Sequence, residues 1–280
     1  MSDEDQTNES GGGQDSARLE RVAAALAGVR DAVDHSVLAL GEPAVVDARA
    51  GREEVISRIE GHLLPRLADA DAPMVVVVGG STGSGKSTLV NSIAGLPITA
   101  VGAKRPTTTT PVIVCHPDDL AWFSERRILP GMARGARADG DAPASLSVAM
   151  STALPPGLAV IDAPDIDSVA EANHALADEL LRAADVWFWA TTPTRYGDRR
   201  PLEYLERAGP YRRPLAALIN KLEATVRNTV VGLLRERLTD AGLEDVPVFT
   251  ADRGLTEDAR LPDDVMTPIR DWIARAGDPE

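Results

Sequence analysis

The sequence predicts an α/β fold in which helices cover both faces of a mostly parallel sheet. The first observation is that short apolar runs of strand length alternate with helical patterns from Pro73 onward. The second is the stretch Gly80–Ser87, which reads GSTGSGKS and stands between the apolar run Met74–Val78 and the helical pattern Ser87–Ala94. A glycine-rich turn between a strand and a helix is the context in which this pattern marks a phosphate-binding loop, or P-loop.

A helical extension is predicted ahead of this domain, over 18–72. Apolar residues recur at steps of three and four from near Ala17 to Leu40, which predicts a helix with one narrow apolar stripe. A second helix is predicted over Val45–Leu67. We expect the two helices to form a hairpin that packs on the main domain; packing on a partner or on a second copy of the chain is the alternative. Residues 1–17 are acidic and glycine-rich, and we expect them to be disordered.

The main domain is predicted over 73–280. Its expected strands are Met74–Val78, Val112–Cys115, Leu146–Ala149, Leu158–Asp162, Val186–Ala190, Leu215–Asn220 and Val246–Thr250. Its expected helices are Ser87–Ala94, Glu171–Ala183, Leu202–Arg207, Ala224–Ala241 and Val265–Ala274. The polar segment 117–143 is interpreted as an insertion, in which Trp122 and Phe123 form either a local core or a partner surface.

The chemistry of a phosphate-binding loop explains the residue types in Gly80–Ser87. Glycines let backbone N–H groups curl around a polyphosphate, and the helix that follows points its positive end at the same anion. Lys86 is expected to reach the β- and γ-phosphates, and Ser87 to offer its hydroxyl to Mg²⁺. The residues assigned to the phosphates are Gly80, Ser81, Gly83, Ser84, Gly85, Lys86, Ser87 and Thr88.

Two further positions are expected to complete a magnesium site. In guanine-nucleotide switches, a threonine between the first helix and the second strand ligates Mg²⁺ and senses the γ-phosphate. Thr108 fits this position best, and Thr107 and Thr109 are the alternatives. Asp162 ends an apolar strand and can hold Mg²⁺ through water. The predicted metal ligands are Ser87, Thr108 and Asp162, and the predicted catalytic residues are Lys86, Thr108 and Asp162.

The segment after Asp162 departs from the pattern of switch GTPases. Those proteins continue as D-x-x-G, and the glycine gives a backbone N–H to the γ-phosphate. Here Asp162–Asp165 reads DAPD. Asp165 keeps the N–H, but its carboxylate is expected to repel a phosphate unless it is turned away. Ile166 stands where Ras-like enzymes place a glutamine that orients water, so slow hydrolysis is expected.

A predicted strand near the C-terminus ends in Asn220-Lys221-Leu222-Glu223. The motif N-K-x-D recognises guanine because its carboxylate accepts two hydrogen bonds from the base, and Glu223 offers the same charge on a longer arm. Asn220 and Lys221 fit the motif as they stand. Thr250-Ala251 resembles the S-A element whose backbone N–H contacts guanine O6. These five residues, Asn220, Lys221, Glu223, Thr250 and Ala251, are the predicted base contacts, and Asp165 is assigned to the phosphate side.

The composition narrows the possible partners and compartments. The net charge is −14, which argues against a surface for nonspecific binding of nucleic acid or anionic membranes. Cys115 is the only cysteine, so an internal disulfide is excluded and a reducing cytoplasm fits. The acidic N-terminus does not read as a signal peptide, and no apolar run approaches the roughly 20 residues of a membrane span. We expect a cytoplasmic protein, with peripheral membrane association as an alternative.

The residues from Met74 to Ala274 resemble GTPases of the Era-like and bacterial dynamin-like branch, in particular actinobacterial dynamin-family proteins. The resemblance is carried by VGGSTGSGKST, RPTTTTP, IDAPDIDSV and, at Arg195–Asp198, RYGD. Related sequences often carry D-L-P-D in place of D-x-x-G, as at Asp165. The resemblance implies a P-loop NTPase G domain that binds GTP and GDP with Mg²⁺.

We therefore expect a switch that hydrolyses GTP to GDP and phosphate in a Mg²⁺-dependent manner. Self-association or a protein partner at the N-terminal helices is expected to assist it. The alternatives are a nucleotide-dependent scaffold with little or no hydrolysis, an ATPase or small-molecule kinase, and a membrane-remodelling machine of the dynamin type. The threonine loop and the Asn220–Glu223 element speak against the ATPase and the kinase, and the sequence shows no membrane paddle.

Overall fold

The computed structural model divides the chain into two compact units, which are treated separately here. The first unit is Met1–Ala72 with Arg127–Pro130, and the second is Pro73–Arg126 with Gly131–Glu280. The residues that the structure describes are 9–36, 44–68, 71–98, 111–125, 128–129, 132–134, 145–166, 171–198, 202–203, 205, 214–254 and 260–277.

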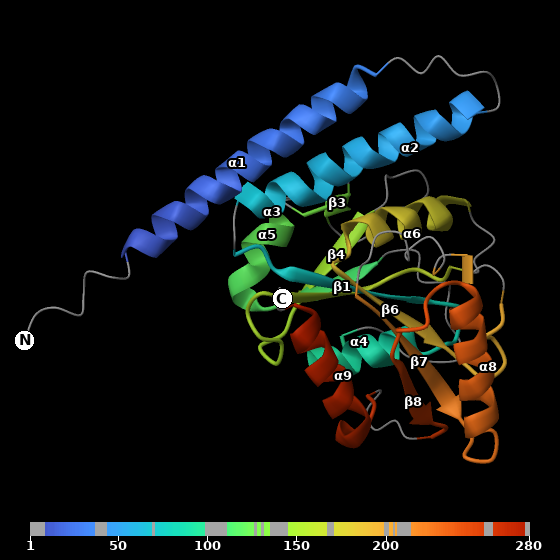
Figure 1. Cartoon of the computed structure of the whole chain (residues 1–280). Helices are drawn as coiled ribbons and strands as arrows, with labels where there is room; N and C mark the ends of the chain where they lie inside the picture. Colours follow the sequence, from blue (N-terminus) through green and yellow to red (C-terminus); the bar gives the residue numbers. More distant parts are fainter. Residues whose placement is uncertain are drawn as a thin grey trace, which may run out of the picture. The chain divides into compact units, whose positions relative to one another are not determined.

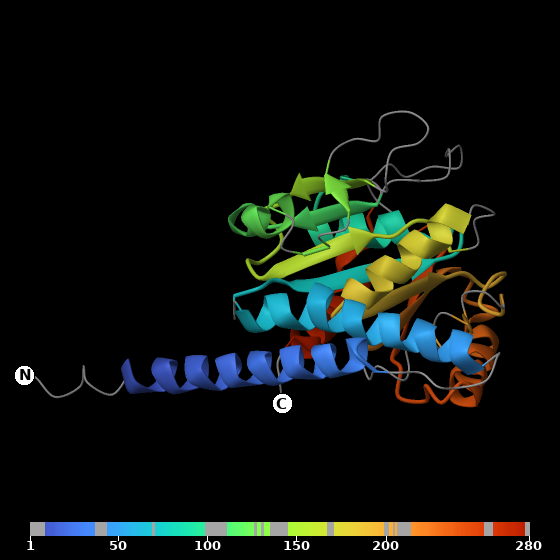
Figure 2. The same cartoon turned by 90° about the horizontal axis from the view of Figure 1, so that it is seen from above.

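The first unit is a helical hairpin (Figures 1 and 2). Its first arm is α1 (Glu9–Asp34). Its second arm runs without interruption through α2 (Ala44–Arg58), the π-helical turn η1 (Ile59–Leu63) and α3 (Leu64–Ala68). The two arms contact each other, and Arg30 of α1 donates a 2.6 Å hydrogen bond to the Glu60 carboxylate of η1.

The start of α1 differs from the expectation. Composition predicts disorder over 1–17, whereas the helix begins at Glu9 and includes Gly11–Gly13. Each glycine disfavours a helix by about 1 kcal/mol. Once a helix has formed downstream, however, each added residue gains a backbone hydrogen bond without a new nucleation step. The apolar residues beyond His35 that predicted a longer helix fall mostly in 37–43, outside the described residues.

The second unit is built on a mostly parallel sheet with the order β3-β4-β2-β5-β1-β6-β7-β8. The strands are β1 (Met74–Gly80), β2 (Val112–Cys115), β3 (Ala133–Arg134), β4 (Ser145–Met150), β5 (Leu158–Asp162), β6 (Val186–Thr191), β7 (Leu215–Leu222) and β8 (Val248–Asp252). Of the pairs that the described strands form, only β2 with β5 is antiparallel. All seven predicted strands are confirmed, and β3 is added within the predicted insertion.

Helices lie on both faces of this sheet, as Figure 1 shows for α4 and α9 on one side and α6 on the other. The described helices are α4 (Lys86–Ala94), η2 (Pro117–Asp119), α5 (Leu120–Ser124), α6 (Glu171–Ala183), α8 (Arg227–Asp240) and α9 (Asp263–Ala276). Four of the predicted helices are confirmed within a few residues. The fifth, Leu202–Arg207, lies mostly outside the described residues.

Alternation along the central strands gives the sheet two apolar faces. Phe188 of β6 belongs to the core cluster that includes residues of α4 and α9. Its neighbours Trp187 and Trp189 point to the opposite face and are each 1% exposed. The insertion is also packed inside, because Trp122 and Phe123 of α5 are 8% and 0% exposed. Of the two interpretations of this aromatic pair, burial supports the local core.

The topology brings several loops to one edge of the sheet. Because β1, β5, β6, β7 and β8 run in the same direction, the segments that follow them leave at the same end. The register places Val78 of β1 beside Asp162 of β5, and Gly80 beside Ala190 of β6. Ile219 of β7 lies beside Thr250 of β8. The phosphate loop and the segments after β5 and β7 therefore meet there.

Candidate functional site

The phosphate loop connects β1 to α4, and two of its glycines are required by close neighbours. Gly80 has a φ of +144°, and a Cβ there would lie 2.1 Å from the carbonyl oxygen of Ala190. Gly85 has a φ of +96°, and a Cβ would lie 2.0 Å from the side-chain nitrogen of Asn220. Both positions thus exclude a side chain on steric and on conformational grounds. The loop is packed against β6 and β7 by its backbone.

The loop offers uncommitted hydrogen-bonding groups where an anion would bind. Gly85 caps α4 without a side-chain hydrogen bond, and the first N–H groups of a helix have no acceptor within the helix. The hydroxyls of Ser81 and Ser84 are buried, and neither finds a hydrogen-bond partner among the described residues. Buried polar groups without partners are uncommon in folded proteins and call for an explanation. A phosphate fits these groups, since it accepts hydrogen bonds on all sides.

Lys86 lies inside the curve of the loop and is 4% exposed. Its Nζ donates hydrogen bonds of 3.0 Å to the carbonyl oxygens of Gly80 and Ser81. It also donates to the carboxylate of Asp165, with which it forms an ion pair. The ammonium is therefore held against the backbone of the loop and against Asp165.

Asp165 points toward the loop rather than away from it. Its Oδ1 accepts from Lys86, and its Oδ2 accepts a 2.9 Å hydrogen bond from the hydroxyl of Thr82. The residue is 8% exposed. Sequence reasoning identified the unusual position of this carboxylate but could not foresee its two partners. Thr82 was not among the predicted site residues, because its place in GSTGSGKS is one that any residue can occupy.

The two predicted magnesium ligands that the structure describes lie in contact. Ser87, at the start of α4, donates a 2.5 Å hydrogen bond to Oδ2 of Asp162, at the end of β5. They are 3% and 2% exposed. A hydroxyl and a carboxylate oxygen are the hard ligands that Mg²⁺ takes, so the pair fits this ion. Thr108, the third predicted ligand, lies in 99–110, outside the described residues.

The end of β7 is tied to the phosphate loop by two side chains. Asn220 donates from Nδ2 to the carbonyl of Ser84 at 3.2 Å, and its Oδ1 accepts from the backbone N–H of Lys221 at 2.8 Å. Lys221 donates from Nζ to the carbonyl of Gly83 at 2.8 Å. Lys221 also has a φ of +58°, which is rare for a residue with a side chain and is found where the surroundings enforce it.

Two of the three remaining predicted base contacts, Glu223 and Thr250, interact with arginines. The Glu223 carboxylate pairs with Nε of Arg253 at 3.4 Å, and both side chains are more than half exposed. The Thr250 hydroxyl accepts from Arg227 at 3.2 Å, and Arg227 also pairs with Asp252. Ala251 is 1% exposed. Sequence reasoning missed the two arginines and Asp252, although Asp252 and Arg253 directly follow the Thr250-Ala251 element.

Comparison with known proteins supports the fold. Among solved structures, the chain is similar to a structure described as an oligomerised bacterial dynamin pair that senses and tethers membranes over long range. The TM-score is 0.54 at 10% identity, over 98% of this chain and 53% of that one. The shared fold is the α/β fold of a P-loop NTPase G domain, with a mostly parallel sheet. The chain spans about half the length of the dynamin, and an identity this low shows a shared fold only.

Other similarities are weaker. Era, in complex with MgGDPNP and a segment of 16S ribosomal RNA, gives a TM-score of 0.45 at 18% identity, over 72% of this chain and 57% of that one. A Toc33 mutant from Arabidopsis thaliana gives 0.46 at 15% identity, over 81% and 92%. Both TM-scores are below 0.5, which is too low to establish a shared fold. No protein-family model matches the chain, and no curated protein matches it.

Proposed function

We propose that this chain binds GTP and GDP with Mg²⁺ and hydrolyses GTP slowly, as a switch. The observation that supports this most directly is the junction of Lys86, Asn220 and the phosphate loop. Lys86 sits in the curve of the loop, and Asn220 holds the same loop from the end of β7. Asn220, from the groups assigned to the base, thus adjoins the groups assigned to the phosphates, which supports a single nucleotide site.

The phosphate side of the proposal follows from charge and hydrogen bonding. Lys86 would bind the phosphates by its ammonium, and the loop N–H groups with the hydroxyls of Ser81 and Ser84 would bind their oxygens. Ser87 and Asp162 would hold Mg²⁺, which neutralises charge on the β- and γ-phosphates. Thr108 remains proposed as the third ligand.

The base side follows from Glu223. A carboxylate at this place would accept hydrogen bonds from N1 and N2 of guanine, and adenine has no donors there. To do so, Glu223 must leave Arg253, and an exposed ion pair of this kind contributes only about 0–1 kcal/mol. Guanine is therefore favoured over adenine, and an ATPase is the less supported alternative.

Slow hydrolysis is proposed from two residues near the phosphate loop. Ile166 is fully buried and has no side-chain group that could orient a water molecule. Asp165 adds a negative charge where the transition state requires neutralisation. The same two residues support the second candidate function, a scaffold that binds nucleotide but hydrolyses it barely or not at all.

We also propose that self-association through the N-terminal hairpin assists the switch. The bacterial dynamin of similar fold is oligomerised, and a GTPase with slow intrinsic turnover can be accelerated by a residue from another subunit. No helix of the described residues is both long and apolar enough to cross a membrane. A cytoplasmic location with peripheral membrane contact stays a proposal.

Calorimetric titration with GDP and ADP, each with Mg²⁺, tests this function. We expect GDP to bind at least about tenfold more tightly than ADP, since unmatched groups in a base pocket weaken binding by about 1–3 kcal/mol each. Lys86→Ala should abolish binding. Arg270→Ala is the matched control, because Arg270 contacts Ser92, in the last turn of α4, rather than the loop. Equal affinity for GDP and ADP would remove the guanine assignment, and full binding by Lys86→Ala would overturn the site.

A further inference from the structure

We propose that Asp165 makes the site discriminate between nucleotides, favouring diphosphates over triphosphates by occupying the position of the terminal phosphate. The inference rests on the proposed function of the phosphate loop and deepens it. It begins from the two oxygens of the carboxylate, each of which accepts a hydrogen bond from the loop, one from Lys86 and one from Thr82. An anion with two acceptor oxygens on these donors resembles the end of a polyphosphate chain.

The contact between Lys86 and Asp165 uses one of the three hydrogen bonds that Lys86 can donate. An ammonium has three N–H donors, and Lys86 uses them on Gly80, Ser81 and Asp165. Two of these acceptors are neutral carbonyls of the loop itself. The third is the only charged one. A γ-phosphate, which lies beyond the loop, would compete for Lys86 with the carboxylate, because that partner also lies outside the loop. A β-phosphate held within the loop would compete with a loop carbonyl instead.

The backbone on both sides of Asp165 is hydrogen-bonded to β1, so a shift of the backbone is not available to separate the carboxylate from Lys86. Ala163 donates its N–H to Val78 at 3.1 Å, and Ile166 donates its N–H to Gly80 at 3.4 Å. Ile166 is also fully buried. Both ends of this short segment are thus fixed to β1. Release of the carboxylate from Lys86 would require rotation of the Asp165 side chain while its backbone stays in place.

A diphosphate and a triphosphate meet this carboxylate differently. The loop N–H groups and the start of α4 can hold the β-phosphate, whereas the position beyond Lys86 is where a γ-phosphate would lie. A diphosphate leaves Asp165 on Lys86 and Thr82. A triphosphate brings a second anion to the same two donors. Like charges that share a site disfavour each other strongly, by a factor of about ten or more.

The test measures binding rather than turnover. The full-length chain, Asp165→Asn and a control variant are titrated with GDP and with a non-hydrolysable GTP analogue, each with Mg²⁺. Asp165→Asn keeps the shape and removes the charge. The wild type should bind GDP more tightly than the analogue. In Asp165→Asn the ratio of the two dissociation constants should move about tenfold toward the triphosphate.

The control is Asp263→Asn, which makes the same change of net charge at the start of α9. Asp263 pairs with Arg270, which contacts Ser92 in the last turn of α4, at the end of the helix away from Lys86. Its ratio should equal that of the wild type. A second variant, Thr82→Val, keeps the charge of Asp165 and removes the hydrogen bond to its Oδ2, so its ratio should move in the same direction by a smaller factor.

The outcomes separate failure of the discrimination by Asp165 from failure of nucleotide binding itself. Equal changes for both nucleotides in Asp165→Asn, or no change, would overturn the discrimination by Asp165 and leave the binding site standing. Weaker binding of the triphosphate analogue in Asp165→Asn would overturn it as well. If the folded wild type and all three variants bind neither nucleotide, the proposed function fails, and the inference fails with it.

Discussion

Gly85 and Gly83 lie two residues apart in the phosphate loop and differ in their surroundings. Both have positive φ, but a Cβ at Gly83 would meet no atom within 4 Å, whereas a Cβ at Gly85 would collide with Asn220. Glycine is therefore required in the loop for two different reasons, a positive φ and a lack of space for a Cβ. Of these two glycines, only Gly85 is required for both reasons.

This difference predicts unequal effects of the same substitution. Gly83→Ala should lower the free energy of unfolding by about 1 kcal/mol, because alanine disfavours positive φ. Gly85→Ala adds the collision with Asn220 and should cost about 2 kcal/mol or more. Urea denaturation of both variants measures the two losses. Similar values for the two would contradict the close packing of the loop against β7.

Cys115 at the end of β2 offers a second test at this scale. Burial, with a smaller contribution from the charge of Asp119, raises the pKa of its thiol to about 11. At about pH 8 the thiolate fraction is then roughly a hundredfold lower than in the unfolded chain, and alkylation by iodoacetamide should be slowed at least as much. The folded state also holds this proton more tightly, so stability should fall as the pH rises from about 9 to about 11. Alkylation at equal rates with and without denaturant would contradict the burial.

Among the elements, α4 and the segment before α9 are joined by one hydroxyl. Ser92 of α4 donates to the carbonyl of Thr88 and accepts from the backbone N–H of Leu261, both at 2.6 Å. Ser92 is 1% exposed. The hydroxyl thus fixes the helix that carries Lys86 to the segment that leads into α9.

Ser92→Ala would leave the N–H of Leu261 buried without an acceptor. We expect the free energy of unfolding to fall by about 1–3 kcal/mol. Ser36→Ala is the control. The Ser36 hydroxyl lies just beyond α1 and donates to the carbonyl of Val33, in the last turn of that helix, at an exposed place, so its loss should change stability by less than about 0.5 kcal/mol. Thermal unfolding followed by circular dichroism compares them. Equal stability of the two variants would contradict a role for Ser92 in joining the elements.

At the level of elements the sequence was informative for a physical reason. The central strands are buried on both faces and read as continuous apolar runs, so each could be located from composition alone. The polar residues at their carboxyl ends could be assigned to one pocket because parallel strands bring those ends together. Side-chain direction could not be derived in this way. The turn of Asp165 toward Lys86 and the positive φ of Lys221 depend on neighbours from β1 and the loop.

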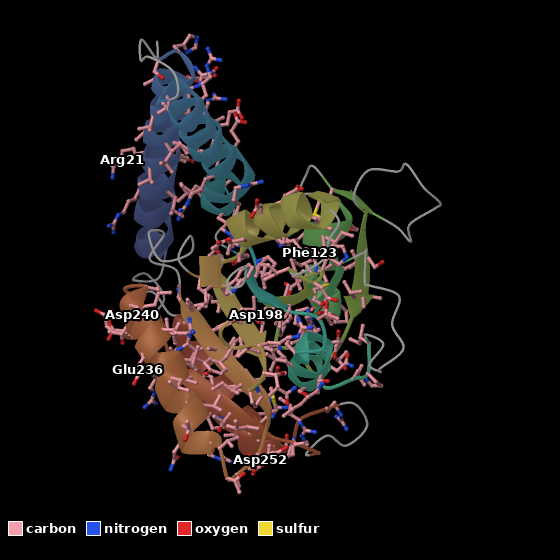
Figure 3. All side chains as sticks on the ribbon, turned by 90° about the vertical axis from the view of Figure 1, so that its right-hand side faces the viewer. Arg21, Phe123, Asp198, Glu236, Asp240 and Asp252 are labelled. Carbon is pink, nitrogen blue, oxygen red and sulfur yellow. The ribbon has the colours of Figure 1, made fainter. Side chains whose placement is uncertain are left out.

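For the whole molecule, the N-terminal hairpin is the unit to which the proposed function gives a role in association. Val22 and Val29 of α1 are 42% and 49% exposed and lie seven residues apart, on the same face of the helix. Figure 3 marks Arg21 on the same helix. Exposed valines at this spacing are suited to contact with a second apolar helix.

Replacement of both valines by glutamate should suppress any assistance between chains. We expect phosphate release per chain to rise with protein concentration in the wild type and in the control Arg21→Glu, by up to about a thousandfold where a neighbour supplies a cation. The doubly substituted chain should stay at the low rate while its affinity for GDP is unchanged. A wild-type rate that is independent of concentration would exclude assistance by self-association.

The two ties from β7 to the phosphate loop have a consequence for redesign. Asn220 donates to the carbonyl of Ser84, and Lys221 donates to the carbonyl of Gly83. A substitution of either residue that is meant to change the preferred base would therefore also alter the loop proposed to bind the phosphates. Under the proposed function, base preference and phosphate affinity are thus coupled at these two positions. Glu223 is different, because its ion pair with Arg253 lies outside the loop. A chain with a new preferred base is therefore best sought by changes at Glu223.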